Sequence, residues 1–570
     1  MRMPWRSGLA CVAGGLLAAL APASCAALKS GLALPCVGSA RPAEAQAAAE
    51  RPAGADRSAE QPPRGGPPGA AGQETPRASA GAPGGSVGAS ADGAVEVTVQ
   101  DAVLMAIEHN QELVVQRMTP AVVRTFEQEA RGVFDPVLLG TFGYERERAE
   151  GLSSRGRLFE FSSHSLVGEV GVTRFLPTGT TVGLGATTEI ADAGTGRQLV
   201  QSRLGLTVTQ ALLRGFGTGV NLANIRQARL DTLASEYELR GFSEAVVALV
   251  EQTCWDYVLA ERQLEIYRQS VALAEEQANV IRERARAGTI PATDLTAAES
   301  ELAFRRQDIV DAGSDREKAR IRLLRLLNPP GDAGGVWNRQ VRLLEKAALP
   351  DAPLDDVESH VQVALRMRPD LNQARLALQR GDLRLVETRG GLLPRMDLFI
   401  TLGRSGYAES FSGSLKNQDD HRYDLLFGVS AEYPLGNHQA RAAHERATVS
   451  RRQAEEAVRN LENLVQVDVR TAHVEAGRAR DKVAAVAATR KLDEDKLRIE
   501  MEKFLAGRSS SFQVARAQRD LVRSQIAEVT TVVEHLKALV DLYRLEGSLL
   551  ERRGISAPGA GPPKEQAYRR

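Results

Sequence analysis

The sequence predicts an α+β protein in which very long α-helices alternate with groups of β-strands, and three observations lead to this fold class. No proline interrupts residues 221–287, a run of roughly 67 residues that would extend about 100 Å as a helix. Segments such as 423–433 alternate apolar and polar side chains with period two. The same order of helix, strands and long helices occurs twice, so we expect two internal structural repeats.

The overall composition argues against several functional classes. The 570 residues include 72 Lys and Arg and 72 Asp and Glu, so no excess charge favours a nucleic-acid partner. Of the four cysteines, only Cys254 lies beyond the first forty residues, and one cysteine cannot form a disulfide framework or a thiolate metal site. The eight histidines show no metal-ligand spacing. We therefore expect no metal and no cofactor.

The N-terminus is typical of an exported protein. Two arginines precede a short apolar run and small residues follow it, which predicts a signal peptide over residues 1–27. Cys25 is a candidate for lipid modification, although Pro22 occupies the position where a lipobox normally has leucine. Residues 28–94 are mostly Ala, Pro, Gly and Ser, so we expect a disordered linker and a folded body that begins near Val95.

Two repeats and their connection account for the rest of the chain. The opening segments align at a constant offset of 258 residues, at which Arg131-Gly132 falls on Arg389-Gly390 and Pro136 falls on Pro394. The predicted divisions are a first repeat at 95–329, a connection at 330–353, a second repeat at 354–552 and a flexible tail at 553–570.

Each repeat is expected to contain an opening helix, strands, a long helix, a tight turn and another helix. Thr98 and Asp101 are placed to begin the first opening helix. In the first repeat the later elements are strands within 136–210 and helices over 221–287 and 293–328. In the second repeat they are strands within 395–433 and helices over 437–506 and 510–550.

The strands are about ten residues long and have one apolar face. This length and alternation fit a membrane-spanning strand. They fit a half-buried sheet of a soluble protein equally well, so the periodicity leaves both open. In the first repeat, residues 165–175 and 180–190 are predicted to form a hairpin around "LPTGT".

Apolar residues at heptad spacing predict that the long helices pack lengthwise as coiled coils. They recur every seven positions from 250 to 278 and in steps of four and three from 522 to 543. Tight turns follow at Gly288 and Gly507. The residues predicted to cap the next helices are Thr289 or Thr293 and Ser509 or Ser510.

The glycine-rich passage "LLRGFGTGVNLANIRQAR" raises the question of a phosphate-binding loop. A dinucleotide fingerprint requires a third glycine where this sequence has Val220 after Gly215 and Gly217, and no Walker lysine follows. The following helix is also too long for a compact βαβ unit. We therefore interpret the glycines as a passage from strand to helix. Because no convincing nucleophile–base pair is present either, we expect no catalytic residues and no enzyme.

The residues as a whole resemble the TolC-like outer membrane efflux protein family, the outer membrane factors. "GLTVTQALLRGFGTGVNLANIRQAR" and "FGVSAEYPLGNHQARAAHERA" resemble the strand-to-helix passages of that family. "VTVQDAVLMAIEHNQELVVQR" is similar to its opening helix, and "FLAGRSSSFQVARAQRDL" to its periplasmic hairpin tip. The resemblance covers about 95–550 in order and in both halves; the duplicated arrangement is more specific than any single motif.

The resemblance implies a homotrimer in the cell outer membrane. Four strands per subunit would form a twelve-stranded transmembrane β-barrel, and antiparallel coiled-coil helices would continue it as a barrel through the periplasm. The connection at 330–353 would supply an equatorial belt. The implied function is the channel of a tripartite efflux or type I secretion system, which receives substrate from a periplasmic adaptor and an inner-membrane RND or ABC-type transporter. An exported coiled-coil scaffold is the alternative.

The resemblance also implies functional residues at the helical turns, and the sequence departs from the family there. An adaptor would dock near Gly288, Thr289, Gly507 and Arg508. Asp294 matches the position of an aspartate that lines the closed tip in the family, but the corresponding positions of the second repeat hold Gln513 and Arg516. We expect Asp294 to pair with Arg508 or Arg516 across the closed tip.

The number of strands is a second departure. The first half contains about four strand candidates where the family usually has two. The hairpin at 165–190 could enlarge the barrel or lie outside it, and the sequence does not decide between these arrangements.

Overall fold

The computed structural model describes residues 95–152, 156–192, 198–329, 336–350, 353–418 and 422–557, to which every structural statement below refers. All of them belong to one compact unit, Gly84–Arg570. The predicted signal peptide, Cys25 and the linker at 28–94 lie outside the described residues, as does the tail beyond residue 557.

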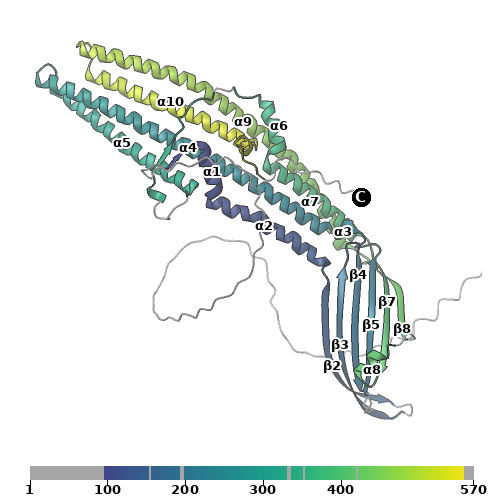
Figure 1. The fold of residues 1–570 in the computed structure, drawn as a ribbon. Helices are drawn as coiled ribbons and strands as arrows, with labels where there is room; N and C mark the ends of the chain where they lie inside the picture. Colours follow the sequence, from purple (N-terminus) through teal and green to yellow (C-terminus); the bar gives the residue numbers. More distant parts are fainter. Residues whose placement is uncertain are drawn as a thin grey trace, which may run out of the picture. The chain divides into compact units, whose positions relative to one another are not determined.

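The first repeat contains two opening helices, four strands and two long helices (Figure 1). In chain order these are α1 (Val99–His109), α2 (Gln111–Arg131), β2 (Val137–Leu152), β3 (Leu158–Phe175), β4 (Thr180–Asp192), β5 (Gln198–Ala211), α4 (Ala223–Arg286) and α5 (Ala292–Leu327). The short elements are β1 (Val95–Val97), the 3-10 turn η1 (Gly132–Phe134) and α3 (Thr218–Asn221).

The second repeat follows the same order with fewer strands. Its elements are α6 (Val357–Met367), α7 (Pro369–Gly391), β7 (Arg395–Ala408), α8 (Phe411–Lys416), β8 (Tyr423–Glu432), α9 (His438–Leu505), α10 (Ser511–Leu545) and α11 (Leu549–Arg552). The connection between the repeats contains η2 (Val336–Asn338) and β6 (Val341–Leu343). The helices α6 and α7 and the strand β7 begin 258 residues after α1, α2 and β2, at the offset that the sequence predicts.

The start of α1 has the predicted cap. Thr98 Oγ1 accepts a hydrogen bond from the Asp101 amide at 3.1 Å, and the Asp101 carboxylate accepts one from the Thr98 amide at 3.2 Å. The opening helix is nevertheless divided in each repeat, at Asn110 and Arg368. Asn110 caps α2 through the Leu113 amide, and Pro369 disfavours helical backbone at the residue before it.

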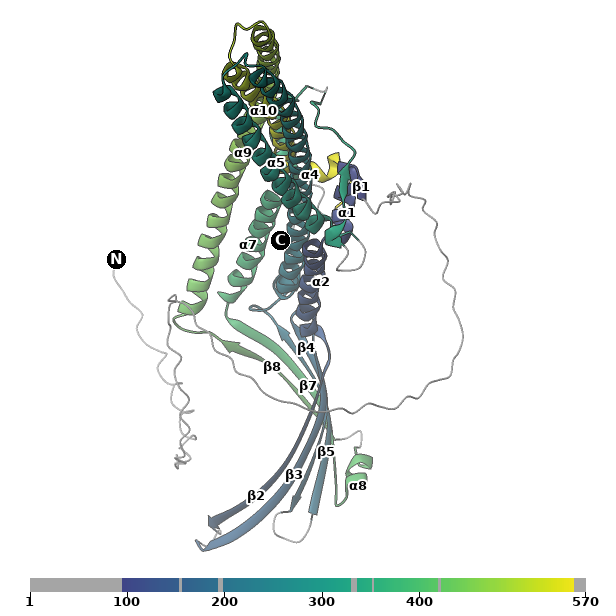
Figure 2. The same ribbon diagram turned by 90° about the vertical axis from the view of Figure 1, so that its left-hand side faces the viewer.

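The long helices pack along one another as the heptad pattern predicts. The helix α4 lies against α5 and α10, and α10 lies against α9. Nearer the strands, the order of neighbours is α2, α4, α7 and α9 (Figure 2). Of the predicted seam on α4, Val250, Tyr257, Leu264 and Ala278 are buried.

The C-terminal long helix ends earlier than predicted. Val522, Val533 and Val540 are buried on α10, but the helix stops at Leu545 rather than at residue 550. Gly547 then adopts a φ of 72°, which reverses the chain before α11. The predicted long helix is therefore two helices with a turn between them.

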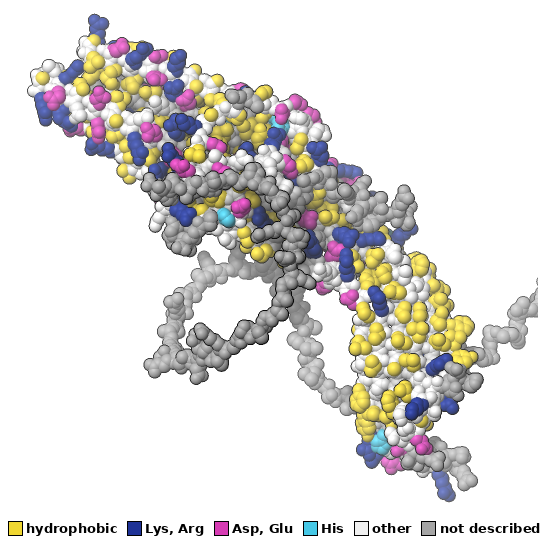
Figure 3. Space-filling view, viewed as in Figure 1, with side chains coloured by type: hydrophobic (Ala, Val, Ile, Leu, Met, Phe, Trp, Pro, Cys, Tyr) yellow, Lys and Arg dark blue, Asp and Glu magenta, His cyan; other side chains and the backbone are white. Residues whose placement is uncertain are grey.

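The strands form one continuous sheet of six strands. The order is β2-β3-β4-β5-β7-β8, and every neighbouring pair is antiparallel. The predicted hairpin at 165–190 lies inside this sheet as β3 and β4, between β2 and β5. Hydrophobic side chains cover the strands densely, whereas charged side chains are scattered over the helices (Figure 3).

A second, two-stranded sheet connects the beginning of the body to the inter-repeat connection. The strands β1 and β6 pair in parallel, and the Tyr257 hydroxyl donates to the Val341 carbonyl at 2.8 Å. Val97, Val341 and Leu343 are buried in the main hydrophobic cluster. This sheet was absent from the sequence-based prediction.

The glycine passage after β5 serves the backbone, as interpreted from the sequence. Gly215 and Gly217 have φ values of 84° and 91°, which favour glycine. Asn221 donates to the carbonyl oxygens of Gly215 at 2.8 Å and Pro177 at 3.1 Å, and so ties this passage to the β3–β4 turn. At the same turn, Gly179 has a φ of 87°, and a Cβ there would collide with the Gly215 carbonyl oxygen.

We predict that Gly179→Ala destabilises the protein by about 2 kcal/mol or more, because the substitution adds both a backbone collision and an unfavourable φ. Urea unfolding of the purified protein in detergent would measure the effect. Gly219→Ala is the matched control, since a Cβ at Gly219 meets nothing within 4 Å. Equal stability of the two variants would contradict this account of the turn.

Candidate functional site

Two turns between long helices form the candidate site. Gly288 and Gly507 have φ values of 71° and 73°. After each glycine, the next amide bonds back to the preceding helix: Thr289 N donates to Arg284 O at 3.0 Å and Arg508 N to Lys503 O at 2.8 Å. Both turns thus close in the same way around a left-handed glycine, as the sequence predicts.

The predicted caps at these turns are wrong in direction. The Thr289 hydroxyl donates to the backbone carbonyl of Arg284 at 2.8 Å, and the Ser509 hydroxyl donates to the side-chain carboxylate of Glu500 at 2.8 Å, so both bond back to the helix that ends rather than to the next one. Pro291 occupies the N-cap position of α5, which places Thr293 within the helix. Ser510 occupies the N-cap position of α10, but its side chain makes no capping hydrogen bond.

The two hairpins lie side by side, with both turns at the same end of the helices (Figure 1). The Arg284 guanidinium lies 5.3 Å from the centroid of the Phe504 ring, a cation–π contact between α4 and α9. Arg519 Nε of α10 lies 4.0 Å from the Glu301 carboxylate of α5. Each protomer therefore presents its two tips as one unit.

The predicted gate residues lie close to these turns. Asp294 is in the first turn of α5, and Gln513 and Arg516 are in the first two turns of α10. Among the described residues of the single protomer, no ion pair joins Asp294 to Arg508 or Arg516. A pairing of these residues across the tip would therefore bring together different copies of the chain.

Exposed apolar side chains near the tips were missed by the sequence analysis. Phe304, Leu505 and Phe512 are each more than half exposed. The predicted seams cover only 250–278 and 522–543, so none of these three residues was assigned a place in the packing. In water such side chains mark contact surfaces when they gather in one region.

A cluster of buried charges fixes the C-terminal segment against α4. Arg240, with no exposed surface, donates to Glu551 Oε1 at 2.6 Å and to the Gly547 carbonyl at 2.9 Å. Arg553 donates to both carboxylate oxygens of the buried Glu251 at 2.6 Å. The predicted flexible tail is therefore ordered at its start, because buried ion pairs and the main hydrophobic cluster hold residues 553–557.

A histidine–carboxylate pair connects α6 to the end of α10. His360 Nδ1 lies 2.5 Å from Glu546 Oε2, and both side chains are buried. Burial by itself would raise the pKa of Glu546, but the hydrogen bonds from His360 and Ser548 and the charge of Arg552 hold that pKa below its usual value. Glu546 is thus a buried anion with three partners.

Glu244 belongs to the same region but has the opposite character. Its Oε1 lies 3.2 Å from Arg240 Nε, which is within ion-pair distance. The N–H group of Arg240 is not directed at this oxygen closely enough for a hydrogen bond. Burial raises the pKa of Glu244 to about 8, against the opposing charge of Arg240. At neutral pH Glu244 is therefore mostly protonated, and the Arg240 charge is balanced by Glu551.

We predict that Glu244→Gln removes a loss of stability at alkaline pH. Because the folded pKa is raised from 4.5 to about 8, the stabilisation from Glu244 is complete below pH 4.5 and declines until the pH exceeds 8, by a few kcal/mol in all. The melting temperature of the Gln variant should fall less between pH 6 and pH 9. Glu238→Gln, exposed on the same helix, is the control; identical pH profiles for wild type and Glu244→Gln would refute the assignment.

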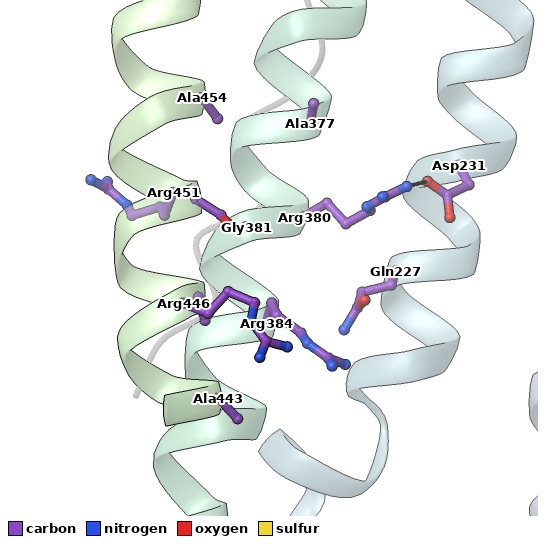
Figure 4. A pocket seen from close by; sticks show the side chains of 12 residues that line it. Gln227, Asp231, Ala377, Arg380, Gly381, Arg384, Ala443, Arg446, Arg451 and Ala454 are labelled. Carbon is purple, nitrogen blue, oxygen red and sulfur yellow. Dashed lines mark hydrogen bonds and ion pairs between the residues drawn. The ribbon is translucent and has the colours of Figure 1, made fainter. Parts of the chain in front are cut away.

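An arginine-lined groove lies between α4, α7 and α9, at the end of these helices nearer the strands (Figure 4). Its volume is about 560 Å³, and its four arginines are Arg380, Arg384, Arg446 and Arg451. Arg380 donates to Asp231 of α4 at 2.7 Å, and Arg451 of α9 donates to Asp382 of α7 at 2.8 Å. The groove thus contains ion pairs that join α7 to both neighbouring helices.

Metal-binding groups and membrane-spanning helices were sought in the described part of the chain. No group of three or more His, Cys, Asp or Glu side chains is arranged to hold a metal ion there. None of the helices in those ranges is both long enough and apolar enough to cross a membrane.

Several solved structures share this arrangement, and two of those described next are outer membrane channels. A membrane protein from Pseudomonas aeruginosa is 21% identical, with a TM-score of 0.59, over 79% of this chain and 90% of that one. The outer membrane channel OprN is 16% identical, with a TM-score of 0.59, over 79% and 90%. The open state of the Neisseria gonorrhoeae MtrE outer membrane channel is 18% identical, with a TM-score of 0.56, over 79% and 89%. At these identities the likeness shows a shared fold, that of outer membrane channel proteins.

The sequence identifies the family. The outer membrane efflux protein family matches residues 170–329 and 360–548, more than half of the chain, so this protein belongs to that family. No curated protein sequence matches it. The predicted resemblance, the outer membrane location and the channel function in tripartite efflux are confirmed. Members of this family trimerise and work with adaptor and inner-membrane pump proteins. The family is not known as an enzyme family. These findings decide against the coiled-coil scaffold.

Proposed function

We propose that three copies of this chain join in a ring to form a channel that conducts substrate passively out of the cell. The sheets close into one β-barrel in the outer membrane, and the long helices form a tunnel in the periplasm. A periplasmic adaptor and an inner-membrane RND or ABC-type transporter deliver the substrate and supply all the energy, in efflux or in type I secretion.

The observation that carries this proposal is the position of the unpaired edges. The chain passes from α2 through η1 directly into β2, and from β8 directly into α9. Thus α2 and β2 form one edge of the protomer, and β8 and α9 form the other. Both edges run through the sheet and the helical wall alike, so a ring of copies would pair them all along their length.

Both edge helices carry apolar side chains without a partner in the protomer. Each of the following side chains is more than half exposed: Val115, Met118, Val122 and Phe126 on α2, and Val449, Val467 and Val474 on α9. The four residues of α2 recur at spacings of three and four, so they form one stripe. An apolar stripe of this length on a helix that is exposed to water is typical of a surface that is buried on assembly.

The tips supply the proposed adaptor site and gate. We assign adaptor docking to the surface around Gly288, Thr289, Gly507 and Arg508, where the exposed Leu505 and Phe512 provide apolar contact area. The gate is proposed to be held by Asp294 with Arg508 or Arg516 of a neighbouring copy, while Gln513 lines the same level without a charge. Such exposed pairs contribute about 1 kcal/mol each, which suits a gate that a partner opens.

We predict that Met118→Glu prevents assembly. Burial of an unpaired carboxylate in each interface would cost several kcal/mol, because the charge loses its hydration. Light scattering of the detergent-purified protein would measure the change from trimer to monomer. Gln128→Glu, exposed on another side of α2, should remain trimeric. A trimer that survives Met118→Glu unchanged would exclude α2 from the interface.

We predict that Asp294→Ala increases leakage through the closed channel, because the tip loses the negative partner of its arginines. Planar-bilayer conductance without adaptor would show a higher basal current, by a few-fold for about 1 kcal/mol. Glu299→Ala, one turn further along α5 and paired with Arg282 of the same protomer, is the control. Unchanged closed-state leakage in Asp294→Ala would remove this residue from the gate.

A further inference from the structure

The extra hairpin of the first repeat is an integral part of the sheet. The strands β3 and β4 pair with each other from residue 164 to 175 and from 181 to 192. The outer side of β3 pairs with β2 from 158 to 173, and the outer side of β4 pairs with β5 from 180 to 192. A hairpin lying outside the wall would leave such pairings unmade, so the register assigns β3 and β4 to the wall itself.

One face of the sheet is apolar across all six strands. Register places the following residues in a single row, one from each strand: Leu138, Val172, Leu184, Leu206, Leu402 and Leu425. Continuous large aliphatic side chains on one face are those of a wall that contacts lipid. The extra strands contribute Val172 and Leu184 to this row, and therefore face the same medium as the other four.

The opposite face carries mostly small and polar side chains, although Leu139 of β2 pairs with Gly171 there and Phe399 and Leu426 lie on the same face. At the next level, register aligns four glycines of adjacent strands, Gly171, Gly185, Gly205 and Gly403. Arg203 of β5 reaches over Gly403 to Asp424 of β8 at 2.5 Å, and a Cβ on Gly403 would lie 2.5 Å from that carboxylate. We name Gly171, Gly185, Gly205 and Gly403 the glycine belt. An ion pair and glycines on one face, opposite the aliphatic row, mark this face as the aqueous side.

The two edges of the sheet are suited to pairing between copies. Because six antiparallel strands alternate in direction, β2 and β8 run in opposite directions. The β8 edge of one copy can therefore pair antiparallel with the β2 edge of the next, which leaves no open edge in the membrane. Any number of copies keeps this alternation, since each supplies an even number of strands.

We infer that the channel closes as an eighteen-stranded barrel, wider than the twelve strands implied by the family resemblance, with the glycine belt facing its bore. The inference rests on the proposed trimer, because six strands from each of three copies give eighteen. With a strand spacing of about 4.8 Å and a tilt of about 40°, the backbone radius rises from about 12 Å to about 18 Å. The four glycines add no side chains to this bore, and the Arg203–Asp424 pair lies over the belt at Gly403.

The wide bore has a functional consequence. A barrel of this radius leaves an aqueous passage at the outer membrane, as eighteen-stranded porins do. Bulky cargo, including an extended polypeptide segment, passes such an exit without being selected by size. Any selection among substrates then takes place at the helical tips around Gly288 and Gly507, and the barrel serves only as an open exit.

Two measurements test this inference on the full-length protein. Electron cryo-microscopy of the purified particle should show eighteen strands around a threefold axis, with a backbone radius near 18 Å. A charged, membrane-impermeant methanethiosulfonate reagent should modify Gly185→Cys, on the bore face of β4, but not Leu184→Cys, its neighbour on the lipid face. The body has only the fully buried Cys254 as background, and wild-type protein digested to a body fragment after labelling would verify that it stays unmodified.

The outcomes separate the inference from the proposed function. A trimer with a twelve-stranded barrel, or equal modification of Gly185→Cys and Leu184→Cys, would overturn the inference and leave the channel function intact. A particle without threefold symmetry would overturn the proposed trimer itself. Eighteen strands together with selective modification of Gly185→Cys would establish the wide barrel.

Discussion

Backbone hydrogen bonding in lipid is the constraint on which the rest of this structure depends. Each N–H and C=O group within a bilayer must be paired inside the protein, and a six-stranded sheet leaves the outer edges of β2 and β8 unpaired. A member of an outer membrane family therefore cannot be complete as this single sheet. The helices are subject to the same requirement. The helix α2 continues the β2 edge, and α9 continues the β8 edge. Whatever closes the sheet therefore also brings these two edge helices together and sets the circumference of the helical part.

The helical part is held by two different kinds of interaction. Heptad packing buries Val250, Tyr257 and Leu264 against neighbouring helices, which fixes how the helices lie lengthwise. Around Arg240 and Glu251, buried ion pairs with the C-terminal segment add a rigid junction, since removal of one partner would leave an uncompensated buried charge. The helical part is therefore held lengthwise by apolar packing and fixed at its C-terminal junction by buried ion pairs.

Much of the fold, and part of the site, could be predicted because the signals are local. Thr98 and Asp101 lie three residues apart and cap their own helix, and Gly288 and Gly507 are needed by the turns in which they occur. The cap direction at Thr289 and Ser509 was mispredicted because a hydroxyl between two helices can serve either one. The buried charges were not foreseen, since Arg240 and Glu551 are 311 residues apart and each alone is typical of a solvated helix surface. The exposed stripe on α2 was likewise hidden, because an apolar periodicity has the same appearance whether it is buried in the protomer or between copies.

The sequence by itself determined the long helices, the strand segments, the two repeats and the positions of the turns, because periodicity, proline and glycine act within a few residues of chain. Only the tertiary structure decided that β3 and β4 lie inside the six-stranded sheet, that β1 pairs with β6, and that residues 553–557 are anchored. These outcomes depend on pairing between distant segments. Alternation along one strand is the same at any place in any sheet, so it specifies the two faces of that strand but not its neighbours.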